Sequence, residues 1–174
     1  LPEYRAAERI ERKRLPPGHA ILGATLIRLG DLQRRMRQLD DADRSLSEAI
    51  DILAASRSGQ YAQALQFHGG LLRAQGRFDL AAQRYLDSFE VFRERTGESV
   101  YTWLTALLRM EALIDAGRIP EADTVASQAR AAFARMPEDP YAKTYETNAT
   151  GLLRHVQGRH AEAIALRREG LDGL

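Results

Sequence analysis

A helix–turn–helix pattern recurs along the sequence at a nearly constant interval, and this recurrence constrains the fold more than any other feature. The glycines that separate two helical segments are Gly76, Gly117 and Gly158, and successive ones are 41 residues apart. Arg37 takes the equivalent position 39 residues before Gly76. Repetition of this length is typical of chains built from stacked units, in which each unit packs only on its neighbours. We therefore predict a solenoid.

The spacing of apolar residues and the positions of the prolines predict that the units are helical. Leu22, Leu26 and Leu29 recur at steps of three and four residues, as on one face of a helix. All six prolines fall at the ends of proposed helices, where they avoid the cost of about 3 kcal/mol that a proline has inside one. No stretch has the alternating pattern of a strand. The predicted helices span 3–14, 20–36, 40–56, 60–75, 78–95, 99–116, 120–135, 139–157 and 160–171.

Small residues at the helix crossings give the pattern a family likeness. The first unit has Leu29-Gly30 in its first helix and Ala42, Leu46 and Ala49 at four- and three-residue steps in its second. This arrangement resembles the tetratricopeptide repeat, in the long-helix form found in kinesin light chains and many bacterial regulatory proteins. The resemblance implies an all-α fold, a right-handed superhelical solenoid of stacked antiparallel helix pairs.

The same resemblance implies how the chain is divided. We expect one domain over 1–174. Its parts are the second helix of a truncated repeat at 3–18 and four repeats at 19–58, 59–97, 98–137 and 138–174. In the last repeat Arg167 stands where a large apolar residue is usual. This departure predicts either a terminal unit that faces water or an end that a partner covers.

Composition argues against several classes of partner. The net charge is +1 with 28% charged residues, so no overall field draws the chain to nucleic acid or acidic lipid. No apolar run approaches the roughly 20 residues of a membrane span. The absence of cysteine removes disulfides and thiolate chemistry and fits a reducing compartment. We expect no nucleic-acid or membrane partner and a cytoplasmic location.

Motifs for catalysis and for metal or phosphate binding are absent from the sequence. It has no phosphate-binding glycine loop, and residues 97–101 lack the last glycine of a serine-nucleophile elbow, so Ser99 is interpreted as a helix cap. His155 and His160 are five residues apart, which is not the spacing of two metal ligands on one helix face. His68 replaces a packing leucine and is predicted to be an interior residue. We therefore predict no enzyme activity, cofactor or metal.

The family resemblance also implies a concave groove lined by the first helix of each repeat. The candidate partner-binding residues are Arg28, Asp31, Arg35, Gln66, Phe67, Arg73, Glu111, Tyr145, Asn148 and His155. The same projection includes the apolar Ile27, Leu104, Leu107, Leu108 and Ala149. An alternative is that part of the strip 104–108 belongs to the core. Arginines and amides can hold acidic groups or a main chain, while apolar residues hold anchors, so the expected partner is a peptide or a protein.

Four functional interpretations remain open on this basis. The first is a non-catalytic protein-interaction module. The alternative is a regulatory or sensor segment of a larger bacterial signalling protein, such as a transcriptional regulator or a kinase. The absence of an initial methionine and the half-repeat at 3–18 favour this second interpretation, a segment cut from a larger protein. The remaining two are an enzyme with an unfamiliar site and a homo-oligomer that associates through its end helices.

Overall fold

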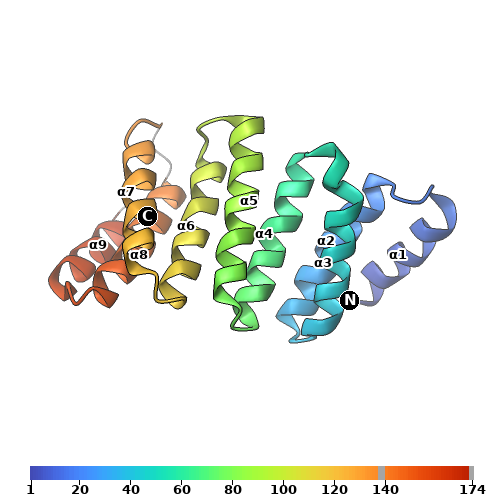
Figure 1. Cartoon of the computed structure of the whole chain (residues 1–174), viewed down its shortest axis with the longest axis horizontal. Coiled ribbons are helices and arrows are strands. Elements are labelled where there is room, and N and C mark those ends of the chain that lie inside the picture. The colour runs from blue at the N-terminus through green and yellow to red at the C-terminus, as the bar shows by residue number, and fades with distance from the viewer. Residues whose placement is uncertain (137–139, 173–174) are drawn as a thin grey trace. The chain divides into compact units, whose positions relative to one another are not determined.

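The computed structural model describes residues 1–136 and 140–172, and within these ranges the chain is helical and contains no strand (Figure 1). The helices are α1 (Pro2–Arg14), α2 (Ala20–Arg35), α3 (Leu39–Leu53), α4 (Gly59–Ala74), α5 (Phe78–Thr96), α6 (Val100–Asp115), α7 (Ile119–Phe133), α8 (Pro140–Val156) and α9 (His160–Asp172), with a short 3-10 helix, η1 (Ala54–Ser56), after α3. Each predicted helix is confirmed within two residues at its ends, except that α3 ends at Leu53, where 56 was predicted, and η1 takes up residues 54–56. Residues 137–139, where two predicted repeats meet, lie outside the described part.

Each turn inside a helix pair is closed by a residue with left-handed backbone geometry. The φ angles are +76° at Gly76, +75° at Gly117 and +79° at Gly158, and Arg37 takes +62°. The amide that follows each of these residues donates back to a carbonyl five residues earlier, as Arg77 N does to Leu72 O at 2.9 Å. This is the Schellman ending of a helix, in which glycine avoids the strain of a Cβ. The predicted turn positions are therefore confirmed.

The chain forms two compact units, Leu1–Arg95 and Thr96–Leu174. In unit 1, α2 packs on α3 and on α4, and α1 packs on α2. Glycine allows the closest approach: a Cβ added to Gly30 would lie 2.6 Å from Leu46 Cγ, and one added to Gly69 would lie 2.9 Å from Tyr85 Cε1. The small residues expected at the helix crossings therefore do bring these helices together. The core of this unit includes Leu22, Leu26, Leu29, Ala49, Leu53, Leu65 and Val91.

Unit 2 is a second set of helix pairs. α6 packs on α7, α8 packs on α9, and α8 also contacts both α6 and α7. The hydroxyl of Ser99 accepts a hydrogen bond from Thr102 N at 3.3 Å, which confirms Ser99 as the cap of α6. Leu107, Leu113 and Leu153 are fully buried in this unit. Arg167 is exposed on α9. The predicted limits of the repeats stay a prediction, since the helices alone do not fix where one repeat ends.

Candidate functional site

Unit 1 carries six of the ten predicted groove residues, on two first helices that pack on each other. Arg28 and Arg35 are exposed on α2, whereas Asp31 is half-buried between them. On α4 the three residues Gln66, Phe67 and Arg73 are half-buried. We call this set, together with Arg34, the unit 1 arginine surface. The direct contact of α2 with α4 brings its two halves together.

The unit 1 arginine surface has more positive charge than it can neutralise internally. Asp31 Oδ1 lies 2.7 Å from Arg34 Nη2, and Asp31 Oδ2 lies 2.9 Å from Arg35 Nε. Two guanidinium groups therefore share one carboxylate. Arg28 has no ion pair or side-chain hydrogen bond anywhere in residues 1–136 and 140–172. Such a surface favours an approaching acidic group.

The α4 half of this surface adds an aromatic ring and a small residue. Phe67 is partly buried and packs on core residues of the first pair. A Cβ added to Gly70 would lie 4.0 Å from Arg34 Nε, so the Arg34 side chain reaches across to α4. The same Nε atom is buried and has no hydrogen-bond partner. Arg34 is thus held in place with part of its hydrogen-bonding capacity unused.

Unit 2 carries the other four predicted groove residues. The Tyr145 hydroxyl on α8 donates to Glu111 Oε1 on α6 at 3.1 Å, which joins two predicted groove residues from neighbouring first helices. Asn148 and His155 are exposed on α8. This half differs from unit 1 in charge, because its predicted residues include a carboxylate and no arginine.

Three residues of the projected groove belong to the core instead. Ile27, Leu107 and Ala149 are 1%, 0% and 4% exposed. Their side chains pack inside their own units and offer almost no apolar surface to a partner. Leu104 and Leu108 are half-buried. The alternative that part of the 104–108 strip is core is therefore confirmed for Leu107.

His68 is an interior residue, as predicted. Its Nε2 lies 3.0 Å from Asp43 Oδ1 on α3, and its Nδ1 is buried with no partner. Burial lowers the pKa of His68 from its usual value of 6.5, against the opposing effect of the hydrogen bond to Asp43. A neutral imidazole that donates to a carboxylate links α4 to α3.

This buried histidine makes stability depend on pH. Because the pKa of His68 is lower in the folded protein, the unfolded chain binds more protons below about pH 6.5. We expect full stability above that pH and a loss as the pH falls from 6.5 through the folded-state pKa. Urea midpoints at about pH 7.5 and pH 5 should differ less for His68→Leu than for the wild type. An unchanged difference would contradict the assignment, and His155→Leu, at an exposed position, serves as the control.

The described residues contain no group of three or more side chains that could hold a metal ion. His155 and His160 do approach each other, with their Nδ1 atoms 3.2 Å apart. Both rings are exposed at the turn between α8 and α9. One imidazole that donates to the other accounts for this contact.

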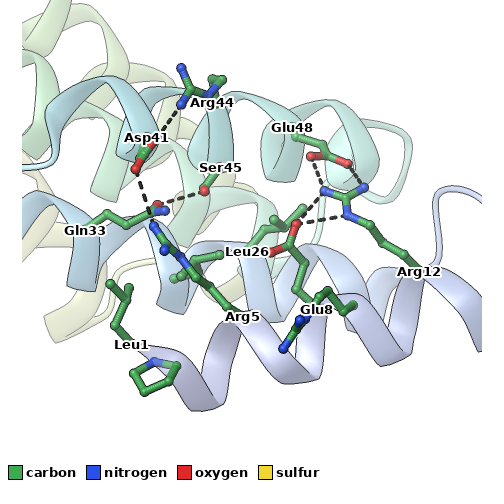
Figure 2. Close-up of a pocket in the computed structure, with 13 residues that line it drawn as sticks. Leu1, Arg5, Glu8, Arg12, Leu26, Gln33, Asp41, Arg44, Ser45 and Glu48 are labelled. Atoms are coloured by element: carbon green, nitrogen blue, oxygen red, sulfur yellow. Dashed lines mark hydrogen bonds and ion pairs between the residues drawn. The ribbon is translucent and has the colours of Figure 1, made fainter.

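A cleft of about 660 Å³ opens between α1 and α3, with α2 as its floor (Figure 2). Its lining comes from three helices: Arg5, Glu8, Arg9 and Arg12 on α1, Leu26, Leu29 and Gln33 on α2, and Asp41, Arg44, Ser45 and Glu48 on α3, with Leu1 and Pro2 at one end. The volume is within the range of ligand-binding clefts. The charged residues on its rim are partly exposed, so the cleft is open to solvent.

A strong ion pair spans one end of the cleft. Arg12 donates to Glu48 through two parallel hydrogen bonds of 2.7 and 2.6 Å, and its Nε donates to Glu8 Oε1 at 2.9 Å. These bonds lower the pKa of Glu48 and raise that of Arg12. The two-point geometry is the favourable one for a guanidinium with a carboxylate, and it fixes the spacing of α1 and α3 at this end.

At the other end the positive charges are in excess. Asp41 pairs with Arg44 and, at the longer distance of 3.5 Å, with Arg5. Arg9 has no ion pair within the part of the chain that the structure describes. Sequence reasoning missed this cleft, because its charged residues resemble an ordinary solvated helix face. The one available signal was Gln33, a polar residue in the apolar stripe of α2.

Solved structures of known proteins share this fold. The chain aligns with a putative kinesin light chain from Podosopora anserina with nearly identical TPR-like repeats at a TM-score of 0.82, with 14% identity over 98% of this chain and 83% of that one. It aligns with BtubC (BKLC) from P. vanneervenii at a TM-score of 0.82, with 18% identity over 98% and 73% of the two chains. A variant of the first protein gives a TM-score of 0.84 at 14% identity.

No family model matches the sequence, and no curated protein matches it significantly. The structural likeness covers nearly the whole chain, so the predicted all-α fold of tetratricopeptide-like repeats is confirmed. At these identities the likeness is one of fold. Stacked repeats of this type create extended surfaces.

Proposed function

We propose that this protein is a non-catalytic scaffold that holds a protein or peptide partner on its first helices, and that the partner presents acidic side chains to unit 1. The observation that carries the proposal is the charge of the unit 1 arginine surface. Arg28 has no ion pair in the described residues, while Arg34 and Arg35 share Asp31. Their guanidinium groups can donate to carboxylates at two points.

The neighbouring side chains suit such a partner as well. Phe67 is only partly buried, so some of its ring is open to a partner, and Gln66 carries an amide that can donate to or accept from a main chain. Aromatic and arginine side chains are enriched among the residues that dominate binding energy at protein interfaces. In unit 2 the Tyr145–Glu111 hydrogen bond, 3.1 Å long, provides a fixed polar position on the same kind of helix.

The proposal extends to location and assembly. No helix in the described residues is both long and apolar enough to cross a bilayer. We propose a cytoplasmic location, which the lack of cysteine favours.

We also propose weak self-association through the end helices. Ile10 on α1 and Ile164 and Leu171 on α9 are 54%, 53% and 69% exposed. Light scattering over a range of concentrations tests this, and a single monomer mass throughout would exclude it.

Charge reversal on the unit 1 arginine surface tests the scaffold proposal. Partners captured from the source cell by the wild type are compared with those captured by the double variant Arg28→Glu, Arg73→Glu. We expect the double variant to lose the acidic partner almost completely, because each lost charge-assisted contact costs roughly tenfold in affinity.

The matched control is Arg14→Glu, Arg168→Glu. It makes the same change in net charge at exposed arginines on α1 and α9, neither of which belongs to the unit 1 arginine surface. If the Arg28→Glu, Arg73→Glu variant captures the partners as well as this control does, the proposal is wrong.

A further inference from the structure

We propose that the cleft between α1 and α3 is a second binding site, which takes an acidic side chain of an extended protein segment. The site is separate from the unit 1 arginine surface. Leu26 and Leu29 form its floor, and Arg28 lies two positions after Leu26, about 200° around the helix. The two surfaces therefore occupy opposite faces of α2, and one can fail without the other.

The charges of the cleft favour an acidic occupant. Four arginines and three carboxylates line it. Arg12 is fully engaged by Glu8 and Glu48, which leaves Arg5, Arg9 and Arg44 with the single carboxylate of Asp41. An incoming carboxylate can pair with Arg9 and Arg5 while Asp41 keeps Arg44. Guanidinium–carboxylate pairs of this kind are stronger than neutral hydrogen bonds.

A buried amide adds a specific donor to the cleft. Gln33 is 4% exposed, and its Oε1 accepts a hydrogen bond of 2.8 Å from Ser45 Oγ. The Gln33 amide nitrogen has no hydrogen-bond partner in residues 1–136 and 140–172, and this atom is not fully buried. It therefore reaches the cleft with a free N–H. Figure 2 shows Gln33 beside Arg5 and Asp41, at the end where positive charge is in excess.

The shape of the cleft favours an extended segment. The Arg12–Glu48 ion pair closes one end, whereas the partly exposed rim leaves the long side open. α1 and α3 are linked across the cleft by ion pairs of long side chains, Arg5–Asp41 and Arg12–Glu48. A main chain can lie along this open side, while one acidic side chain points to Gln33. No second copy of the chain is needed to complete the site.

A synthetic peptide of alternating leucine and glutamate, labelled with fluorescein, is the probe. Its binding is followed by fluorescence anisotropy, and amide chemical shifts locate the contact. We expect binding that shifts the amides of Gln33 and Ser45. The affinity should fall about tenfold in Arg9→Gln and further in Arg5→Gln, Arg9→Gln. Arg9 has no ion pair in the described residues, so its replacement leaves the fold intact.

Two controls separate this site from the unit 1 arginine surface. Arg28→Gln, Arg35→Gln should leave the shifts at Gln33 and Ser45 unchanged, and a peptide with glutamine in place of glutamate should not bind. If only the Arg28 and Arg35 changes weaken peptide binding, the proposed site in the cleft is wrong, and the scaffold proposal is unaffected. Equal binding of the glutamine peptide, or no shift at Gln33 and Ser45 at about 1 mM peptide, would also overturn it.

Discussion

Replacing Gly30 with valine is expected to destabilise unit 1 by about 3 kcal/mol. A Cβ at this position would lie 2.6 Å from Leu46 Cγ, and Leu46 is 0% exposed in the core between α2 and α3. The added methyl groups must therefore push the two helices apart or force Leu46 out of its rotamer. Urea unfolding measures the change as a lower midpoint with an unchanged slope.

Gly59→Val is the matched control, because nothing lies within 4 Å of the Cβ that it adds. It should change stability by less than about 0.5 kcal/mol. Leu46→Ala should cost less in the Gly30→Val background than in the wild type, since the smaller side chain removes the clash. Strictly additive effects would show that the close approach of α2 and α3 is not the cause.

Leu153→Ala is expected to destabilise unit 2 by about 2–5 kcal/mol. Leu153 is 0% exposed on α8, which contacts α6, α7 and α9, so the cavity left behind touches the centre of the unit. Leu171→Ala makes the same chemical change at a side chain of which 69% is exposed, and it should be nearly neutral.

Hydrogen exchange measures which helices lose stability in Leu153→Ala. In a chain of stacked repeats each repeat contacts only its neighbours, so the loss should concentrate where the cavity is. Amides of α8 and α9 should exchange faster in Leu153→Ala, whereas those of α2 and α3 should change little. Equal acceleration in both places would indicate one cooperative core and contradict the description of stacked pairs.

The fold was predictable because its determinants are local in sequence. Gly76, Gly117 and Gly158 mark turns that need left-handed geometry, and only the steric freedom of glycine makes that geometry easy. Arg37 shows the limit of this signal, since it takes the same conformation at +62° without being glycine. The regular interval, and not the residue type, identified that turn.

The candidate site was less predictable, because it depends on which of two adjacent residues turns inward. Ile27 and Arg28 were both assigned to the groove, yet Ile27 is 1% exposed and Arg28 is exposed. The cleft beside α1 was harder still. It arises from the distance at which the Arg12–Glu48 ion pair holds α1 from α3, and residues 36 positions apart in the sequence give no periodic signal of that contact.

The most direct test of the scaffold proposal is photo-crosslinking in the source cell. A photoreactive residue is placed at Gln63 on α4, a half-buried position on the first helix beside Phe67, and separately at Arg14, an exposed position on α1. The account predicts a discrete crosslinked protein from the Gln63 position, lost when Arg28→Glu and Arg73→Glu are added, and none from the Arg14 position. Crosslinks from Arg14 with none from Gln63 would contradict it.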